Sequence, residues 1–224
     1  MRSELSEGLR WVLGNRYLRT VASCTATFNF FGSLMGAILI VYLVRSLEMS
    51  PTRIGLMFTI ATVGSLAAAF TSNRVANKIG VGPAIWAGAL CGIAMLLVPL
   101  APQNADDAFI YIVIAETFVG YGVVLYNVTQ VSMRQAITPE RLQGRMNSVM
   151  RFIVWGVMPP GTLLGGSVAT VFELRTAIWA GAIGVALERG GRVPVEADLS
   201  LEEGGVGRVT DGDEQPAALD LTLL

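Results

Sequence analysis

The sequence predicts an all-α integral membrane protein in which two three-helix repeats have inverted topology and the sixth helix is truncated. Two observations carry this prediction. The 224 residues are 53% hydrophobic and 15% charged, with a mean hydropathy of +0.57, which is a membrane composition rather than a soluble one. The hexapeptide AIWAGA also occurs twice, at 84–89 and at 177–182, which indicates an internal duplication.

Five stretches with at most one charge are long enough to cross a bilayer core of about 30 Å at 1.5 Å per residue. A sixth apolar stretch begins at Thr176 and meets Glu188 after about a dozen residues, fewer than the ~20 that a crossing needs. We therefore expect a transmembrane domain over residues 20–187. Its spans lie at about 20–44, 54–73, 79–101, 108–133 and 147–172, with a partial span at 176–187.

The repeat has further landmarks in the same order. Residues 28–32 (FNFFG) match 118–122 (FVGYG), and 50–53 (SPTR) match 138–141 (TPER). Offsets of about ninety residues favour a duplicated three-helix unit of the kind found in secondary transporters, with chance similarity among Ala, Gly and Ile as the alternative. Because each repeat has an odd number of spans, the second copy should lie upside down relative to the first.

The basic residues predict a cytoplasmic N-terminus in a multi-pass protein of the plasma (inner) membrane. In this orientation nine basic side chains fall on the cytoplasmic side and three fall outside, as the positive-inside rule requires. The cytoplasmic nine are Arg2, Arg10, Arg16, Arg19, Arg74, Lys78, Arg134, Arg141 and Arg145, and the external three are Arg45, Arg53 and Arg175.

The two ends of the chain differ from the transmembrane domain. Residues 1–19 read as a cytoplasmic interfacial helix with Leu5, Leu9, Val12 and Leu13 on one face, or as a plain linker. Residues 188–224 hold three basic and nine acidic side chains, and we expect them to be disordered. Because this tail begins partway through a span, we favour a frameshifted or mispredicted gene end over a natural acidic tail.

The composition argues against several functions. The sequence has no histidine, and its two cysteines, Cys24 and Cys91, lie in different spans. Metal binding, Ser-His-Asp or Cys-His catalysis and a disulfide framework are therefore not expected, so the chain is not predicted to be an enzyme. Neither a phosphate-binding loop nor a basic nucleic-acid surface is present. We therefore expect no cofactor.

Glu116 is the sharpest candidate for chemistry, because a carboxylate inside a span costs roughly 2.5–3.5 kcal/mol and should face protein or water. At 100° per residue, Asn127 and Gln130 share its helix face and Tyr126 lies beside it. We interpret this stripe as a cavity lining that carries substrate or protons. The alternative is a protonated carboxyl sealed by hydrogen bonds between helices. Asn29 is the candidate substrate contact in the first span.

Two further features have both a functional and an ordinary interpretation. Pro159, Pro160 and Gly161 should break the fifth span, either beside a substrate path or as a common proline kink. Arg151 lies near the end of the same span. It could pair with anionic lipid or with an acidic partner, but marking membrane topology is the simpler interpretation.

Several segments together resemble the C-terminal half of a major facilitator superfamily transporter, in the enterobactin-exporter-like branch of drug and siderophore efflux proteins. The resemblance covers roughly residues 6–187, and the loop before the fifth span is its most specific part. The matching segments are EGLRW at 7–11, SP at 50–51 with Gly55, RQAITPERL at 134–142, GRMN at 144–147, Arg151-Phe152, Trp155-Gly156, Pro159 and 161–166.

This resemblance implies proton-driven export of a small amphipathic molecule by a lipid-embedded protein. It also implies that six spans enclose half of the central cavity, so an N-terminal six-helix half or a second copy in a dimer would be needed. Arg74, Lys78 and Gly80 lie in a loop similar to the family's cytoplasmic gating motif, which here lacks its acidic residue. Arg141, Arg145 and Arg151 would mark the same side. The alternative is a membrane scaffold or pseudo-transporter fragment that does not transport.

Overall fold

The computed structural model describes residues 2–187, which are entirely helical apart from short connections, with no strand among them. Five helical segments are long and apolar enough to cross a membrane, and a shorter apolar helix follows them. The helices are α1 (Arg2–Gly14), α2 (Arg16–Arg45), α3 (Pro51–Ile79), α4 (Val81–Leu90), η1 (Cys91–Leu96), α5 (Leu97–Leu100), α6 (Ala105–Ile137), α7 (Glu140–Gly156), α8 (Met158–Val171) and α9 (Leu174–Leu187).

Local sequence signals explain where several helices begin. The Asn15 side chain accepts hydrogen bonds from amides in the first turn of α2, and Ser50 caps α3 with Pro51 in its first turn. Thr138 does not cap α7, because Pro139 occupies the cap position and provides no side-chain hydrogen bond. The predicted disorder and frameshift of 188–224 fall outside the described residues.

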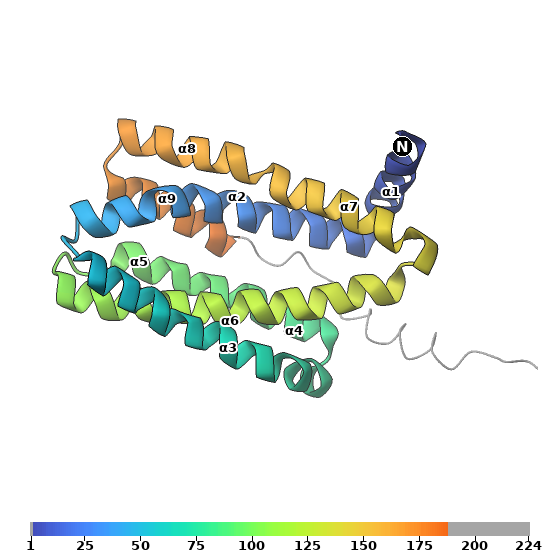
Figure 1. Ribbon diagram of the computed structural model, residues 1–224, viewed down its shortest axis with the longest axis horizontal. Helices are drawn as coiled ribbons and strands as arrows, with labels where there is room; N and C mark the ends of the chain where they lie inside the picture. The colour runs from blue at the N-terminus through green and yellow to red at the C-terminus, as the bar shows by residue number, and fades with distance from the viewer. Residues whose placement is uncertain (1, 188–224) are drawn as a thin grey trace, which may run out of the picture.

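The helices form two bundles that lie side by side along the long axis (Figure 1). One bundle contains α2, α7–α8 and α9, and the other contains α3, α4–η1–α5 and α6. The main contacts of α2 are with α8 and α9, and the main contacts of α6 are with α3 and α4. The first repeat comprises α2 to α5 and the second comprises α6 to α9. Each bundle therefore combines the first span of one repeat with the second and third spans of the other, and the two bundles are equivalent under exchange of the repeats.

Glycine contacts reproduce this exchange at the level of single residues. A Cβ on Gly88, in the first AIWAGA, would meet Gly122 and Tyr126 of α6. A Cβ on Gly181, in the second AIWAGA, would meet Leu34 and Met35 of α2. Because α2 and α6 are equivalent helices of the two repeats, each copy of the hexapeptide makes the same kind of close helix contact. This agreement confirms the repeat inferred from the sequence.

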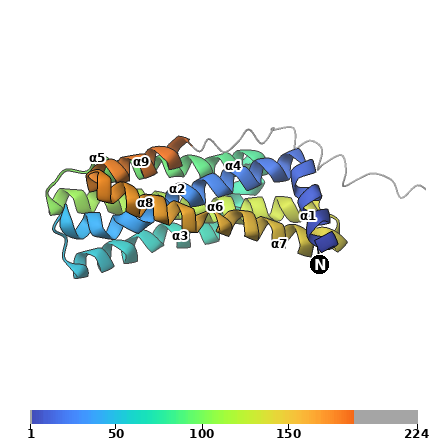
Figure 2. The same cartoon turned by 90° about the horizontal axis from the view of Figure 1, so that it is seen from above.

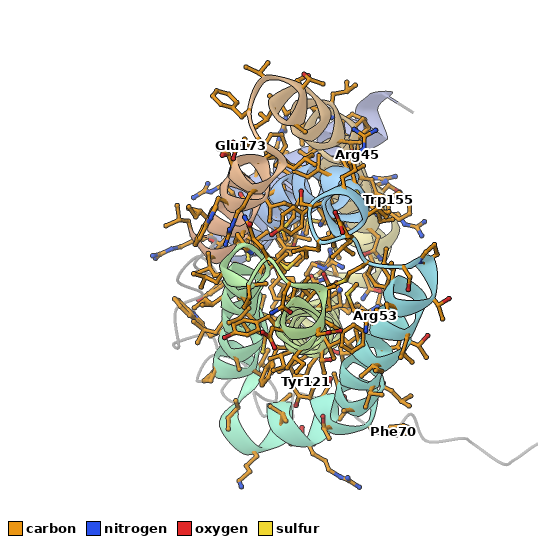
Figure 3. The ribbon with its side chains drawn as sticks, turned by 90° about the vertical axis from the view of Figure 1, so that its left-hand side faces the viewer. Arg45, Arg53, Phe70, Tyr121, Trp155 and Glu173 are labelled. Atoms are coloured by element: carbon orange, nitrogen blue, oxygen red, sulfur yellow. The ribbon has the colours of Figure 1, made fainter. Side chains whose placement is uncertain are left out.

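The outer surface of the bundle is apolar, as a lipid environment requires. Large side chains such as Phe70, Leu163 and Val171 are more than 70% exposed. Figure 3 shows Phe70 directed outward from α3 at the edge of the molecule. Apolar exposure on this scale is rare in soluble monomers, so the described chain is a multi-pass membrane protein.

Helix α1 packs across one end of the bundle, against α7 (Figure 2). The Glu7 carboxylate forms ion pairs with Arg141 and Arg145 of α7, and the Arg141 pair measures 3.5 Å. Val12 is buried, whereas Leu9 and Leu13 are nearly half exposed. The apolar face predicted for this segment is thus divided between a protein contact and an open surface.

We expect Glu7→Gln to loosen α1 from α7, because it removes both ion pairs to the arginines. The loss in the free energy of packing α1 against α7 should stay below about 1 kcal/mol, since the side chains of Glu7, Arg141 and Arg145 are all partly exposed to solvent. Hydrogen–deuterium exchange should show faster exchange over residues 7–14 while the other helices keep their protection. Glu140→Gln is the matched control, and unchanged exchange in α1 would show that packing alone holds the helix.

Candidate functional site

Two adjoining cavities lie between the bundles, with volumes of about 220 Å³ and 590 Å³. Along both α2 and α6, the smaller one lies between two buried apolar clusters, one at each end of the molecule. Helices α2, α6 and α7 contribute to both cavities. The two share the side chains of Thr25, Asn127, Val154 and Trp155, so together they form one continuous space.

The smaller cavity, here called the aromatic cavity, has apolar walls and a polar edge. Phe28, Tyr126 and Trp155 line it together with small residues of α4. Its polar side chains are held by hydrogen bonds: the Tyr126 hydroxyl lies 2.8 Å from the Thr25 hydroxyl, and the Asn29 amide donates to the Thr25 carbonyl at 2.8 Å. The Tyr126–Thr25 bond joins α6 to α2, the equivalent helices of the two repeats.

The larger cavity, here called the polar cavity, continues toward the end of the bundle where α1 lies. Asn127, Gln130 and Arg134 line it from α6, and Asn147 and Arg151 line it from α7. The Gln130 amide donates to the Asn127 side chain at 3.4 Å. The structure therefore brings together four predicted residues (Asn29, Tyr126, Asn127 and Gln130) and adds Arg151 to them.

Glu116 is not among the residues that line either of these two cavities, so its expected role as a cavity-lining residue stays a prediction. It shares a helix face with Val123 and Asn127 but lies about one turn beyond Val119, where the aromatic cavity ends. Its Oε1 atom is buried, and the side chain makes no hydrogen bond with any residue in the described range 7–187. The interhelical hydrogen bonds of the alternative interpretation are therefore not made there.

The fifth span is interrupted at Val157, which separates α7 from α8. Pro159 and Pro160 lie in the first turn of α8, where a backbone N–H would have no partner within the helix. Gly161 lies within α8, where its N–H donates to the Val157 carbonyl at 3.2 Å, and a Cβ there would collide with the Phe30 backbone. Val154 and Trp155, just before the interruption, line both cavities, so the break does adjoin the cavity.

The predicted gating residues do not form a single cluster. Arg74 and Lys78 are exposed near the end of α3 and form no ion pair within the described residues. Gly80 ends α3 with a φ of 88°, a left-handed conformation that favours glycine. Arg141 and Arg145 instead pair with Glu7, and Arg151 faces the polar cavity. Their role in gating stays a prediction.

The lining residues that sequence reasoning missed include Phe28, Arg134 and Trp155. In the sequence, Phe28 stands only in a repeat landmark and Trp155 only in the family resemblance. Neighbouring residues do not reveal whether an aromatic side chain lines a cavity or packs in the core. Arg134 was counted only as a topology marker. A signal for it did exist, since it lies eighteen residues after Glu116 and so falls on the same helix face as Asn127 and Gln130.

A bundle of membrane-crossing helices around a central cavity, with inverted repeats exchanged between two bundles, is the architecture of a secondary transporter. The family model of the Major Facilitator Superfamily matches residues 21–188. The chain therefore belongs to the Major Facilitator Superfamily, a family of membrane transporters, which favours the expectation that it is not an enzyme. A search of curated proteins and a search of solved structures each found no match to the chain.

Proposed function

We propose that the chain acts as the C-terminal half of a proton-coupled transporter that exports small amphipathic molecules, in the drug and siderophore efflux branch. The observation that carries the proposal is the continuous space formed by the aromatic and polar cavities. Its walls change from Phe28 at one end, past Trp155 where the two cavities join, to Gln130 and Arg134 at the other end. A molecule with an apolar and a polar end has a surface to contact at each end.

The proposal includes a partner and an orientation. A second six-helix unit, either an N-terminal half or another copy of the chain, would cover the side where Phe152 and Trp155 are 78% and 67% exposed. The N-terminus and α1 would lie in the cytoplasm of a cell with this protein in its plasma membrane, which places the polar cavity toward the cytoplasm. Protons would supply the energy.

The experiment is transport in proteoliposomes. The full chain is reconstituted alone and together with the product of any neighbouring gene that encodes six further spans. Release of fluorescent amphipathic dyes is then followed under an imposed pH gradient. We expect release that stops when a protonophore collapses the gradient. A chain that stays monomeric, binds no dye and transports none would instead favour the scaffold alternative.

A further inference from the structure

Arg134 is buried in the last turn of α6, yet nothing in the described part of the chain neutralises it. The residue is only 9% exposed, and its Nε atom is buried without a hydrogen-bond partner. Its side chain forms no hydrogen bond or ion pair with any residue in the described range 7–187. A buried charge normally has a partner, because desolvating an ion without one is costly. Arg134 therefore lacks a counter-anion among the described residues, and an anionic ligand would supply one.

The surroundings of Arg134 in the polar cavity fit the same ligand. Gln130 is 4% exposed, and its Oε1 atom is also buried without a partner. Arg151 lines the opposite wall, on α7, without an ion pair in the described chain. Every other polar lining side chain is an uncharged amide or hydroxyl, so the polar cavity has two positive charges and no negative one.

The polar cavity is joined to the aromatic cavity at Thr25, Asn127 and Trp155. A ligand with an anionic group near Arg134 can therefore extend its remaining atoms past Trp155 toward Phe28. Guanidinium groups bind carboxylate, sulfonate and phosphate oxygens through two parallel charge-assisted hydrogen bonds. The apolar part of the ligand gains binding free energy by burying the aromatic surfaces of Trp155 and Phe28.

From this geometry we infer that the joined cavities bind an anionic amphiphile, with its acidic group at Arg134 and Arg151 and its apolar body against Trp155 and Phe28. The inference rests on the proposed function and specifies the charge of its substrate. An organic acid with an aromatic body and an anionic phospholipid share this chemistry. The experiment below separates these two sources.

Binding is measured by equilibrium dialysis of the full chain in phosphatidylcholine nanodiscs. The probes are 1-naphthylacetate and the neutral 2-(1-naphthyl)ethanol, which have a similar apolar body. We expect the acid to bind about 10-fold more tightly after correction for its uptake by empty nanodiscs, because its carboxylate forms charge-assisted hydrogen bonds that the neutral alcohol cannot form. In a Trp11→Phe, Trp86→Phe, Trp179→Phe variant, Trp155 is the one tryptophan left, and quenching of its fluorescence locates the probe.

Three substitutions decide the role of the arginines. Arg134→Gln should remove the preference for the acid, Arg151→Gln should reduce it, and Arg134→Lys should retain part of it. Arg45→Gln is the matched control, because Arg45 is exposed at the opposite end of α2 and forms no ion pair in the described chain. If Arg134→Gln fails to fold, Arg151→Gln and Arg134→Lys still test the inference.

A preference for the acid in phosphatidylcholine nanodiscs that Arg134→Gln removes identifies a soluble amphiphile as the ligand. If this preference is absent, native mass spectrometry in mixed nanodiscs tests the lipid source. Retention of phosphatidylglycerol over phosphatidylcholine, lost in Arg134→Gln, identifies an anionic lipid. Equal binding in all these comparisons overturns the inference. Dye transport in proteoliposomes would then continue unchanged, whereas failure of the proposed function would abolish transport as well.

Discussion

Gly165→Val should destabilise the bundle severely, whereas the same substitution at the next residue should have little effect. Gly165 of α8 is buried against α2, and a Cβ there would collide with the backbone carbonyl of Leu34. The obstacle is backbone, so α2 and α8 must separate. We expect a loss at the upper end of the 1–3 kcal/mol typical of overpacking, or more. Thermal unfolding in detergent, followed by size-exclusion chromatography, measures the effect.

The neighbouring Gly166→Val provides the control. Gly166 is exposed, and a Cβ built there meets nothing within 4 Å. Both substitutions replace glycine by valine in the same helix, so the changes in helix propensity and in side-chain hydrophobicity are matched. Only the contact with α2 differs. Equal melting temperatures for the two variants would show that α8 does not pack against α2 as described.

Glu116→Gln should abolish the pH dependence of efflux in the assembled transporter if Glu116 carries the coupled proton. Glutamine has nearly the same shape but cannot gain or lose a proton. The substitution should leave the fold intact, because the Glu116 side chain makes no hydrogen bond within residues 7–187 that an amide would break. Efflux measured against pH, at constant membrane potential, should change from a pH-dependent rate to a flat one.

Glu173→Gln is the matched control, because Glu173 is exposed in the connection between α8 and α9 (Figure 3). This substitution should leave the pH profile unaltered. A Glu116→Gln transporter with the full pH dependence of the parent would remove Glu116 from proton coupling. The buried Oε1 atom would then have only a structural explanation.

The repeat and the number of spans could be predicted from sequence because both depend on local composition. A stretch of about twenty uncharged residues must form a helix in lipid, where backbone groups have no other partners. The helix ends were harder to predict, because α2 and α6 continue past their apolar segments to Arg16 and Ile137. Outside the bilayer core, polar residues continue a helix without any change in period.

The candidate site was predicted only in part. Asn127 and Gln130 could be found because they share one face of one helix. Phe28, Arg134 and Trp155 line the cavities through the meeting of α2, α6 and α7, which are far apart in sequence. Glu116 shows a second limit of prediction from sequence. The helix angle places it on the same face of α6 as Asn127, but does not show that the lining of the aromatic cavity ends at Val119, about one turn before Glu116.

The exchange of helices between the two bundles has a consequence for biosynthesis. The glycine-lined partner of α2 is α8, which is made more than a hundred residues later. Helix α2 must therefore wait in the membrane, with its packing face towards lipid or an insertion chaperone, while α3 to α7 are synthesised. Neither repeat can mature alone. A ribosome stalled before α8 should leave a chain that quality-control proteases recognise, even though the bundle of α3, α4 and α6 is complete.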